Sequence, residues 1–310
     1  MGNKVIQGIG FCFFLLALFL VHKEITRVGG EHMIHLLQTL PLERVGIALG
    51  LTALDFCFLA GYDILGLRYL HKHVPLFKVC VVSCLGFAVS NTTGHAYLAG
   101  GSLRYTFYKN LLSRLDILKL ITLDSLTFLL GMSVAFIAAV CLLPLEGGAL
   151  PAFYMPVLIG ISGVLLLLLG GYFFAIVRPK RMFHLGSVFI KAPSWRLTLW
   201  QLGVGLGDVL STFLVFYVIL SGVLSVPFWP VMGMFILAWV LGLCSQIPGG
   251  LGVFEGTFLY LFSWVSPNQG EVLTALLVFR VLYYFVPFLV ATLAVVGGWG
   301  IKKLWGKLMA

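Results

Sequence analysis

Long apolar stretches separated by short polar segments recur along the whole chain of 310 residues. A helix rises about 1.5 Å per residue, so roughly 20 apolar residues cross the ~30 Å hydrocarbon core of a bilayer. The pattern predicts simple membrane-spanning helices over 5–22, 45–67, 117–143, 156–177, 196–222 and 272–299. Two further apolar segments, 76–103 and 231–263, are interrupted near their middles and do not fit a single span.

The composition agrees with this pattern. Hydrophobic residues make up 60% of the chain, charged residues 10%, and the mean hydropathy is +1.06, whereas soluble domains carry about 25% charged residues. No polar-patterned stretch of about 100 residues remains for a separate soluble domain. We therefore predict an all-α, polytopic membrane bundle that forms a single integral membrane domain over 1–310.

Lys and Arg are distributed unevenly among the connections and account for the net charge of +9. The basic connections are 68–78, 104–119, 178–196 and the C-terminal 302–307. The connections without Lys or Arg are 144–155, 223–230 and 263–271. The positive-inside rule places the first group in the cytoplasm and the second group outside. It predicts that both termini are cytoplasmic, in the inner (cytoplasmic) cell membrane, and it explains the charge without a nucleic-acid partner.

This topology requires each interrupted segment to begin and end on one side of the membrane. The 28 residues of 76–103 give two helical arms of about 20 Å, too short to cross the bilayer twice. We predict a re-entrant hairpin that enters from the cytoplasm at 76–103 and another that enters from outside at 231–263. For the second segment, two short tilted helices are the alternative.

Residues that interrupt helices lie at the middle of both segments, because Gly permits left-handed backbone and Pro lacks a donor. The predicted tips contain Asn91, Gly94, His95, Pro248, Gly249 and Gly250. Broken backbone at membrane depth is tolerated where protein or a watery cavity satisfies it. The alternative is that the glycines only allow close helix packing. We expect His95 to be a tip residue with satisfied hydrogen bonds rather than a ligand.

The two halves of the chain show the same order of elements. A span, a hairpin and a span follow each other at 45–67, 76–103 and 117–143, and again at 196–222, 231–263 and 272–299. The second set runs in the opposite direction through the membrane, which predicts an inverted-topology repeat. Interrupted segments at corresponding positions of two halves indicate a transport site at the repeat interface.

Ionisable residues inside spans cost about 2.5–3.5 kcal/mol each on insertion scales, so each needs a partner or a cavity. The predicted spans and hairpins contain Asp55, Asp63, Asp124, Asp208, Glu255 and Arg280. Arg280 lies deep in the last span and is expected either to pair with Glu255 or Asp208 or to bind a phosphate, whose oxygens match its guanidinium fork. Glu255 is expected either to titrate or to cap the helix that it begins.

Two residues lie near the ends of predicted elements. Asp63 is expected to reach water or Arg68. Arg104, followed by Tyr105 and Lys109, is expected either to meet lipid headgroups or to be an ordinary basic flank. The sequence contains no HExxH, GxSxG or P-loop motif and no dense His/Cys cluster, so we expect no metal, no cofactor and no enzymatic activity.

Three motifs are similar to those of a known family. The stretch Pro-Gly-Gly-Leu-Gly-Val-Phe-Glu-Gly at 248–256 resembles the signature of the lysylphosphatidylglycerol synthase transmembrane family. This family includes the flippase domain of the multiple peptide resistance factor and stand-alone YbhN-like proteins. The stretch 100–105 resembles its first-hairpin motif, and Arg280 with Tyr283, Tyr284 and Pro287 resembles the pattern of its final helix.

The resemblance implies that the chain flips or transports a lipid, in the best-known members an aminoacylated phosphatidylglycerol. It also implies that Arg104, Gly249, Gly250, Glu255 and Arg280 line or shape the lipid path. The soluble aminoacyl-transferase domain of full-length resistance factors is not part of this sequence. The lipid is therefore left open between a phospholipid, aminoacylated or otherwise anionic, and a hopanoid or isoprenoid lipid.

We predict a lipid flippase or transporter without a cofactor, whose partners are membrane lipids; a homo-oligomer is left open. The candidate lipid-binding residues are Arg104, Asp208, Gly249, Gly250, Glu255 and Arg280. One alternative is a membrane-embedded lipid-modifying transferase with Glu255 or Asp208 as general base. Another is a carrier of polar solutes or ions, since charges at the midplane of the membrane suit that function too.

Overall fold

The computed structural model describes residues 40–93, 96–142, 155–177, 182–185, 188–245 and 247–298. Five of the described helices are long and apolar enough to cross a membrane. They are α3 (Leu42–Tyr69), α6 (Arg114–Leu142), α7 (Met155–Val177), α8 (Trp195–Leu220) and the continuous helix formed by α11 (Gln269–Arg280), η4 (Val281–Phe285) and α12 (Val286–Gly298). These helices confirm the predicted membrane helical bundle, while the predicted span 5–22 lies outside the described residues.

A small β-hairpin was not predicted. Strands β1 (Met182–Leu185) and β2 (Val188–Lys191) pair antiparallel in the basic connection between α7 and α8. Each strand has only four residues, too few for an alternating pattern to be recognised.

Both interrupted segments form pairs of short helices rather than single spans. The first comprises α4 (Leu76–Thr93) and α5 (Ala96–Tyr108), and the second comprises α9 (Phe228–Cys244), the short turn η3 (Pro248–Gly250) and α10 (Val253–Phe262). The arms of the first pair touch, since a Cβ on Gly100 would lie 3.1 Å from the carbonyl oxygen of Gly86.

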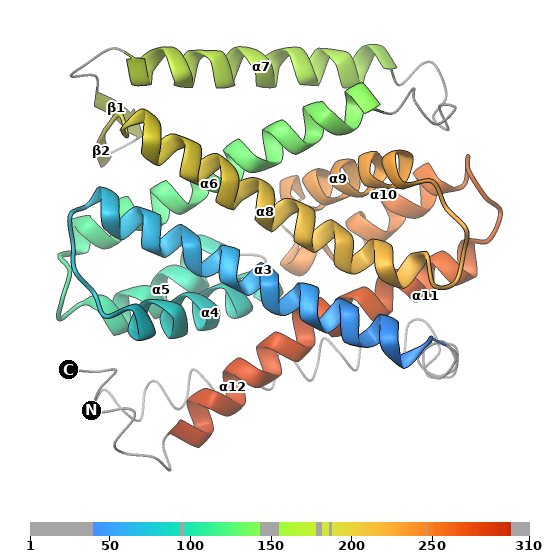
Figure 1. Ribbon diagram of the computed structural model, residues 1–310, viewed down its shortest axis with the longest axis horizontal. Coiled ribbons are helices and arrows are strands. Elements are labelled where there is room, and N and C mark those ends of the chain that lie inside the picture. Colours follow the sequence, from blue (N-terminus) through green and yellow to red (C-terminus); the bar gives the residue numbers. More distant parts are fainter. Residues whose placement is uncertain are drawn as a thin grey trace.

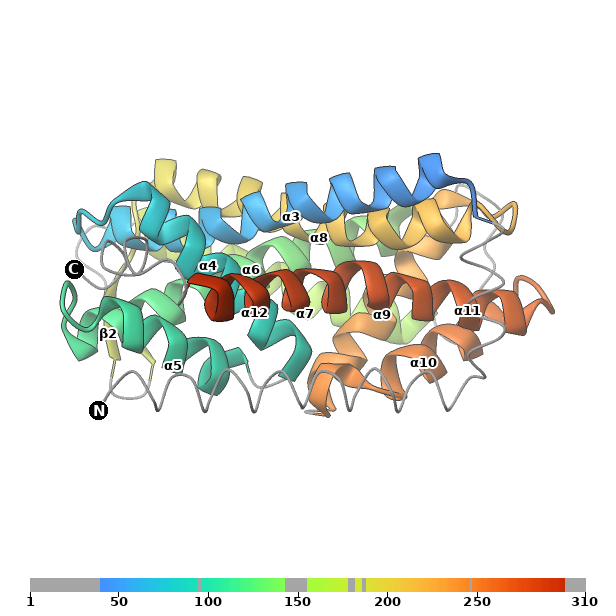
Figure 2. The ribbon, with the colours of Figure 1, turned by 90° about the horizontal axis from the view of Figure 1, so that it is seen from below.

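The two helical hairpins lie at opposite ends of the long axis along which α3, α8 and α11–α12 run, and their adjoining ends face the middle (Figure 2). Near the middle, η3 of the second hairpin contacts α4 of the first. The basic connections after α3 and α5 lie at one end, where Lys72 and Asp116 form an ion pair of 3.1 Å. The position of the hairpins in a bilayer and the inverted repeat stay predictions.

Helix α8 packs between α3 and α6 (Figure 1). At the crossing of α6 and α8, a Cβ on Gly131 would lie 2.2 Å from the carbonyl carbon of Gly205. At the crossing of α3 and α8, a Cβ on Gly207 would lie 2.4 Å from the ring of Phe58. Small residues at these crossings allow backbones to approach closely, as is common in membrane bundles.

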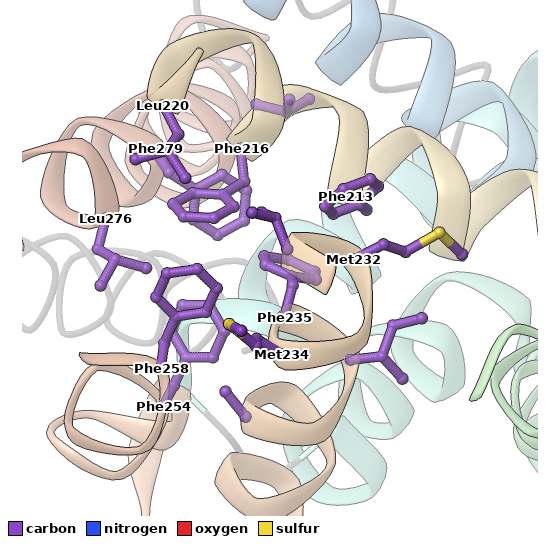
Figure 3. Close-up of a cluster of buried hydrophobic side chains, with 14 of the residues drawn as sticks. Phe213, Phe216, Leu220, Met232, Met234, Phe235, Phe254, Phe258, Leu276 and Phe279 are labelled. Carbon is purple, nitrogen blue, oxygen red and sulfur yellow. The ribbon is translucent and has the colours of Figure 1, made fainter. Parts of the chain in front are cut away.

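An aromatic cluster fastens the second hairpin to the rest of the bundle (Figure 3). The ring of Phe235 on α9 lies 5.3 Å from that of Phe216 on α8, 5.4 Å from that of Phe254 on α10 and 5.7 Å from that of Phe279 on α11. Aromatic pairs at these separations contribute roughly 0.5–1.5 kcal/mol each beyond area burial. They fix the position of the tip that precedes α10.

Helix α7 lies at the edge of the bundle beside α6 (Figure 1). Only 11% of its most apolar window is buried inside the protein, and side chains such as Leu167 and Leu168 are exposed. An apolar helix with so little internal contact is suited to face acyl chains.

Candidate functional site

The first hairpin carries a buried ion pair with α3. Arg104 on α5 donates from Nε to Asp63 Oδ1 at 2.9 Å, and its Nη2 lies 3.2 Å from Asp124 Oδ2 on α6. Ser83 on α4 donates to Asp63 Oδ2 at 2.6 Å, and the guanidinium carbon of Arg104 lies 4.5 Å from the centre of the Phe87 ring. One arginine therefore ties α3, α5 and α6 together.

This arrangement corrects two expectations from the sequence. Asp63 does not reach water or Arg68, and Arg104 is not an exposed flank, since both are buried. The reason is that the hairpin folds back over the end of α3. Glycines leave room for the guanidinium: a Cβ on Gly86 or Gly100 would lie 3.5 Å or 3.3 Å from Arg104 Nη1.

The tip of the second hairpin holds the other buried ion pair. Arg280 Nε donates to Glu255 Oε1, and Arg280 Nη1 donates to the carbonyl oxygen of Gly249 at 2.9 Å. Glu255 Oε2 accepts from the backbone N–H of Gly252 at 2.8 Å. Glu255 is thus both a cap at the start of α10 and the partner of Arg280, and Asp208 is not that partner.

The backbone of this tip explains its glycines. Gly249, Gly250 and Gly252 have φ of 60°, 62° and 82°, in the left-handed region that costs other residues about 1–2 kcal/mol. Three such residues in quick succession turn the chain between α9 and α10. The turn also brings the Gly249 carbonyl to Arg280.

Each arginine retains one donor without a hydrogen bond. Within the described part of the chain, the Nη2 atoms of Arg104 and Arg280 are buried and make no hydrogen bond. An unsatisfied buried donor costs about 1–3 kcal/mol. Arg104 Nη2 still has Asp124 Oδ2 at 3.2 Å, so it is Arg280 that can gain energy from an additional acceptor, and an anionic oxygen is the acceptor that a guanidinium fork binds best.

A third polar cluster lies where α3 crosses α8. Tyr62 donates to Asp208 Oδ2 at 2.6 Å, Tyr283 donates to Asp55 Oδ2 at 2.7 Å, and Ser211 donates to Asp55 Oδ1 at 2.6 Å. The sequence singled out the two aspartates but not Tyr62 or Ser211 as their partners. Tyr62 follows Asp55 by seven residues, a spacing of two helical turns that places both on one face.

The other predicted tip residues have different outcomes. Asn91 lies in the last turn of α4 and is half-buried, and Pro248 begins η3. Gly94 and His95 lie outside the described residues. In the part of the chain that the structure describes, no three His, Cys, Asp or Glu side chains are grouped so that they could hold a metal ion.

The fold and the site define an integral α-helical membrane protein in which two short helical hairpins hold buried arginine–carboxylate pairs. A family model described as the lysylphosphatidylglycerol synthase TM region matches residues 6–291. The chain belongs to this family, which confirms the resemblance seen in its motifs.

The chain is also similar to individual proteins of known sequence. It is 30% identical over 298 residues to an uncharacterized protein of Synechocystis sp., with 93% of this chain and 89% of that protein covered. It is 26% identical over 285 residues to the inner membrane protein YbhN of Escherichia coli, with 90% and 87% covered. A phosphatidylglycerol lysyltransferase of Staphylococcus haemolyticus is 28% identical over 235 residues, which are 74% of this chain but only 26% of that enzyme.

Proposed function

We propose that the protein moves a lipid with an anionic headgroup between the two leaflets. The headgroup passes between the tips of the hairpins while the acyl chains stay in the bilayer. The observation that carries this proposal is the state of Arg280. It is buried in the last span, is held by Glu255 and the Gly249 carbonyl, and keeps Nη2 free of any hydrogen bond among the described residues.

The geometry supports a moving lipid rather than a static one. Arg104 and Arg280 are only 3% and 4% exposed, and η3 contacts α4. A headgroup reaches the arginines only if the tips separate. Because the two hairpins lie at opposite ends of the long axis (Figure 2), separation at one tip opens the site from one side at a time, as alternating access requires.

The candidate residues have distinct roles in this proposal. Arg280 binds the phosphate, Glu255 positions the guanidinium, and Gly249 and Gly250 provide the turn that brings a carbonyl to it. Arg104 offers a second cationic contact on the first hairpin. We place the protein in the inner membrane, in line with the name of the E. coli relative, and the positive-inside rule is the ground for placing both termini in the cytoplasm.

The nature of the lipid follows from the binding chemistry. A guanidinium with a free donor favours a phosphate group, so phosphatidylglycerol, whose headgroup is net negative, is the substrate class that we propose; its aminoacylated form carries the same phosphate. The staphylococcal relative is named for a lysyl transfer to phosphatidylglycerol. The match covers about a quarter of that enzyme, so the transfer is not assigned to this chain.

Movement of a labelled lipid in liposomes tests the proposal. The purified protein is reconstituted with a fluorescent phosphatidylglycerol, and a membrane-impermeant reductant reports which leaflet the label occupies. We expect Arg280→Ala to slow the movement about tenfold or more, because hydrogen bonds to charged groups are worth about 1.5–3 kcal/mol. A rate in wild-type liposomes no faster than in protein-free ones contradicts the proposal.

Arg44→Ala is the matched control for loss of an arginine. Arg44 donates to the carbonyl oxygen of Val218 at 3.1 Å and to Ser221 Oγ at 2.9 Å, at the end of α8 away from the tips, and its loss leaves the rate unchanged. Mass spectrometry of the same liposomes after addition of aminoacyl donors distinguishes the alternative. A new lipid species would indicate a transferase.

A further inference from the structure

Asp55 and Asp208 place two carboxyl groups together in the middle of the bundle. Both are buried, and α3 and α8 bring them to one place: Tyr62 on α3 donates to Asp208 Oδ2 at 2.6 Å, and Ser211, three residues after Asp208 on α8, donates to Asp55 Oδ1 at 2.6 Å. Each of the two helices thus supplies a hydroxyl to the carboxyl group of the other helix, and the two acids share one buried polar cluster.

The surroundings do not neutralise the pair in any other way. Neither carboxyl group forms an ion pair with Lys, Arg or His among the described residues. The titratable groups that face the pair are Tyr62 on α3 and Tyr283 and Tyr284 on η4. Since two buried carboxylates close together cannot both stay ionised without a cation, the pair holds at least one proton.

A hydrogen-bonded chain connects the pair to the last span. Tyr283 gives its only proton to Asp55, so Thr212 is the donor in the 2.8 Å contact between the hydroxyls of Thr212 and Tyr283. Tyr283 belongs to the π-helical turn η4, which begins immediately after Arg280. The ring of Tyr284 in the same turn lies 4.9 Å from the ring of Tyr283 and 5.7 Å from the guanidinium carbon of Arg280.

The π turn thus joins the carboxyl pair to the anion-binding arginine. Turns of this kind are rare, and they are frequent at functional sites. An anion at Arg280 adds negative charge near the pair and pulls on the turn that carries Tyr283. Both effects favour an additional proton on the pair, and by linkage the proton favours the anion to the same extent.

We propose that Asp55 and Asp208 form a proton-binding site that takes up a second proton from water when an anionic headgroup binds Arg280, and releases it when the headgroup leaves. The proton adds to a carboxylate oxygen and returns to water on the other side, and no bond to the lipid is made or broken. The coupling rests on the proposed lipid movement, whereas the proton site itself does not.

Infrared difference spectroscopy of the reconstituted protein tests the proton site independently of transport. On a change of pH we expect a carbonyl band of protonated carboxyl groups that is lost in Asp55→Asn and in Asp208→Asn. Asp116→Asn, which removes a carboxylate of an exposed ion pair, keeps the band. If the band is the same in the wild type and in both dyad variants, there is no proton site at this pair.

A pH gradient across the liposomes tests the coupling. If one proton moves with each lipid, the ratio of the two directional rates changes up to about tenfold per pH unit. We therefore expect wild-type protein to move the labelled phosphatidylglycerol faster away from the acidic side. Asp208→Asn slows movement and removes its response to the gradient, while Asp116→Asn keeps the response. Tyr283→Phe keeps the ring but removes the hydroxyl that donates to Asp55, and we expect it to weaken the response. This variant replaces the aspartate variants in the test if they do not fold.

The outcomes separate the two proposals. Lipid movement that ignores the gradient in wild-type protein overturns the coupling and leaves the proposed function intact. Absence of lipid movement in wild-type protein overturns the proposed function, and the infrared experiment still decides whether the pair binds protons.

Discussion

Asp55 and Asp208 occupy the same position in their helices, each thirteen residues after the first residue of the helix (42 to 55 in α3 and 195 to 208 in α8). They also belong to one polar cluster, in which Tyr62 of α3 donates to Asp208 and Ser211 of α8 donates to Asp55. Residues at equivalent positions of two related halves meet only at the axis that relates the halves. If the predicted inverted repeat holds, its axis passes between these two aspartates, where transporters of this type place their substrate and ion sites.

The two hairpins hold their ion pairs with opposite polarity. In the first, Arg104 lies on the returning arm and its partners Asp63 and Asp124 lie on spans. In the second, Glu255 lies on the returning arm and Arg280 lies on the span. The first pair has one excess carboxylate and the second is balanced, so an arriving anion is favoured at the second hairpin.

We predict that Glu255→Gln destabilises the protein by about 3–5 kcal/mol, because it leaves the buried charge of Arg280 without a carboxylate. Thermal unfolding in detergent measures the effect. In the control Asp116→Asn, the lost partner is Lys72, whose side chain is 40% exposed, and the cost stays below about 1 kcal/mol. Equal shifts for the two variants contradict the prediction.

At the second tip, we predict that Gly250→Ala costs about 1–2 kcal/mol of stability from the left-handed backbone alone. Steric contact adds to this, since its Cβ would lie 3.2 Å from the Cα of Gly242. Gly256→Ala, six residues later on an exposed face of α10 with no atom within 4 Å, should instead stabilise the helix by about 0.5–1 kcal/mol. The same unfolding assay compares the two variants, and a stabilised Gly250→Ala would be inconsistent with the observed turn.

At the crossing of α6 and α8, we predict that Gly131→Ala destabilises the bundle by about 1–3 kcal/mol, because its Cβ would overlap the backbone of Gly205 and force the helices apart. Gly160→Ala on the exposed face of α7, with no atom within 4 Å, is the control and is neutral or slightly stabilising. The midpoint of thermal unfolding in detergent distinguishes them. No difference between the variants would mean that this crossing is not close-packed.

The predicted topology can be tested by labelling of single cysteines in a background without the six native ones. Lys109→Cys, after α5, and Asn268→Cys, before α11, lie in exposed connections at opposite ends of the long axis. An impermeant maleimide should label Asn268→Cys in intact cells and Lys109→Cys only after the membrane is opened. The reverse pattern would invert the assigned orientation.

The helices were predictable because lipid allows a spanning backbone little besides a helix, so apolar length alone located α3, α6, α7, α8 and α11–α12. Glycine and proline at 248–252 located the second tip for a similarly local reason. The surroundings of Asp63 were not predictable. Whether the end of a helix is exposed to water or covered by a hairpin depends on tertiary packing, and the residues next to Asp63 in the sequence do not indicate which occurs.

The partners of the buried charges were predictable in part. Arg280 was expected to pair with Glu255 or Asp208 or to bind a phosphate, and the structure shows Glu255 as its partner. Tyr62 and Tyr283 were missed as partners of the aspartates because tyrosine has many uses in membrane helices. The π turn after Arg280 cannot be recognised from the sequence, because a single such turn hardly changes the spacing of hydrophobic residues along the helix.

At the contact of Gly131 with Gly205, the backbones of α6 and α8 pack directly against each other with no side chain between them. Helices whose backbones are in direct contact can rotate about the point of contact, but their separation would lose this packing without forming a new contact. We therefore expect α3, α6 and α8, which pack together, to keep their positions relative to one another. Any working stroke of the protein then belongs to the hairpins, and it requires the contacts that hold their tips to break, such as the hydrogen bond from Arg280 to the Gly249 carbonyl.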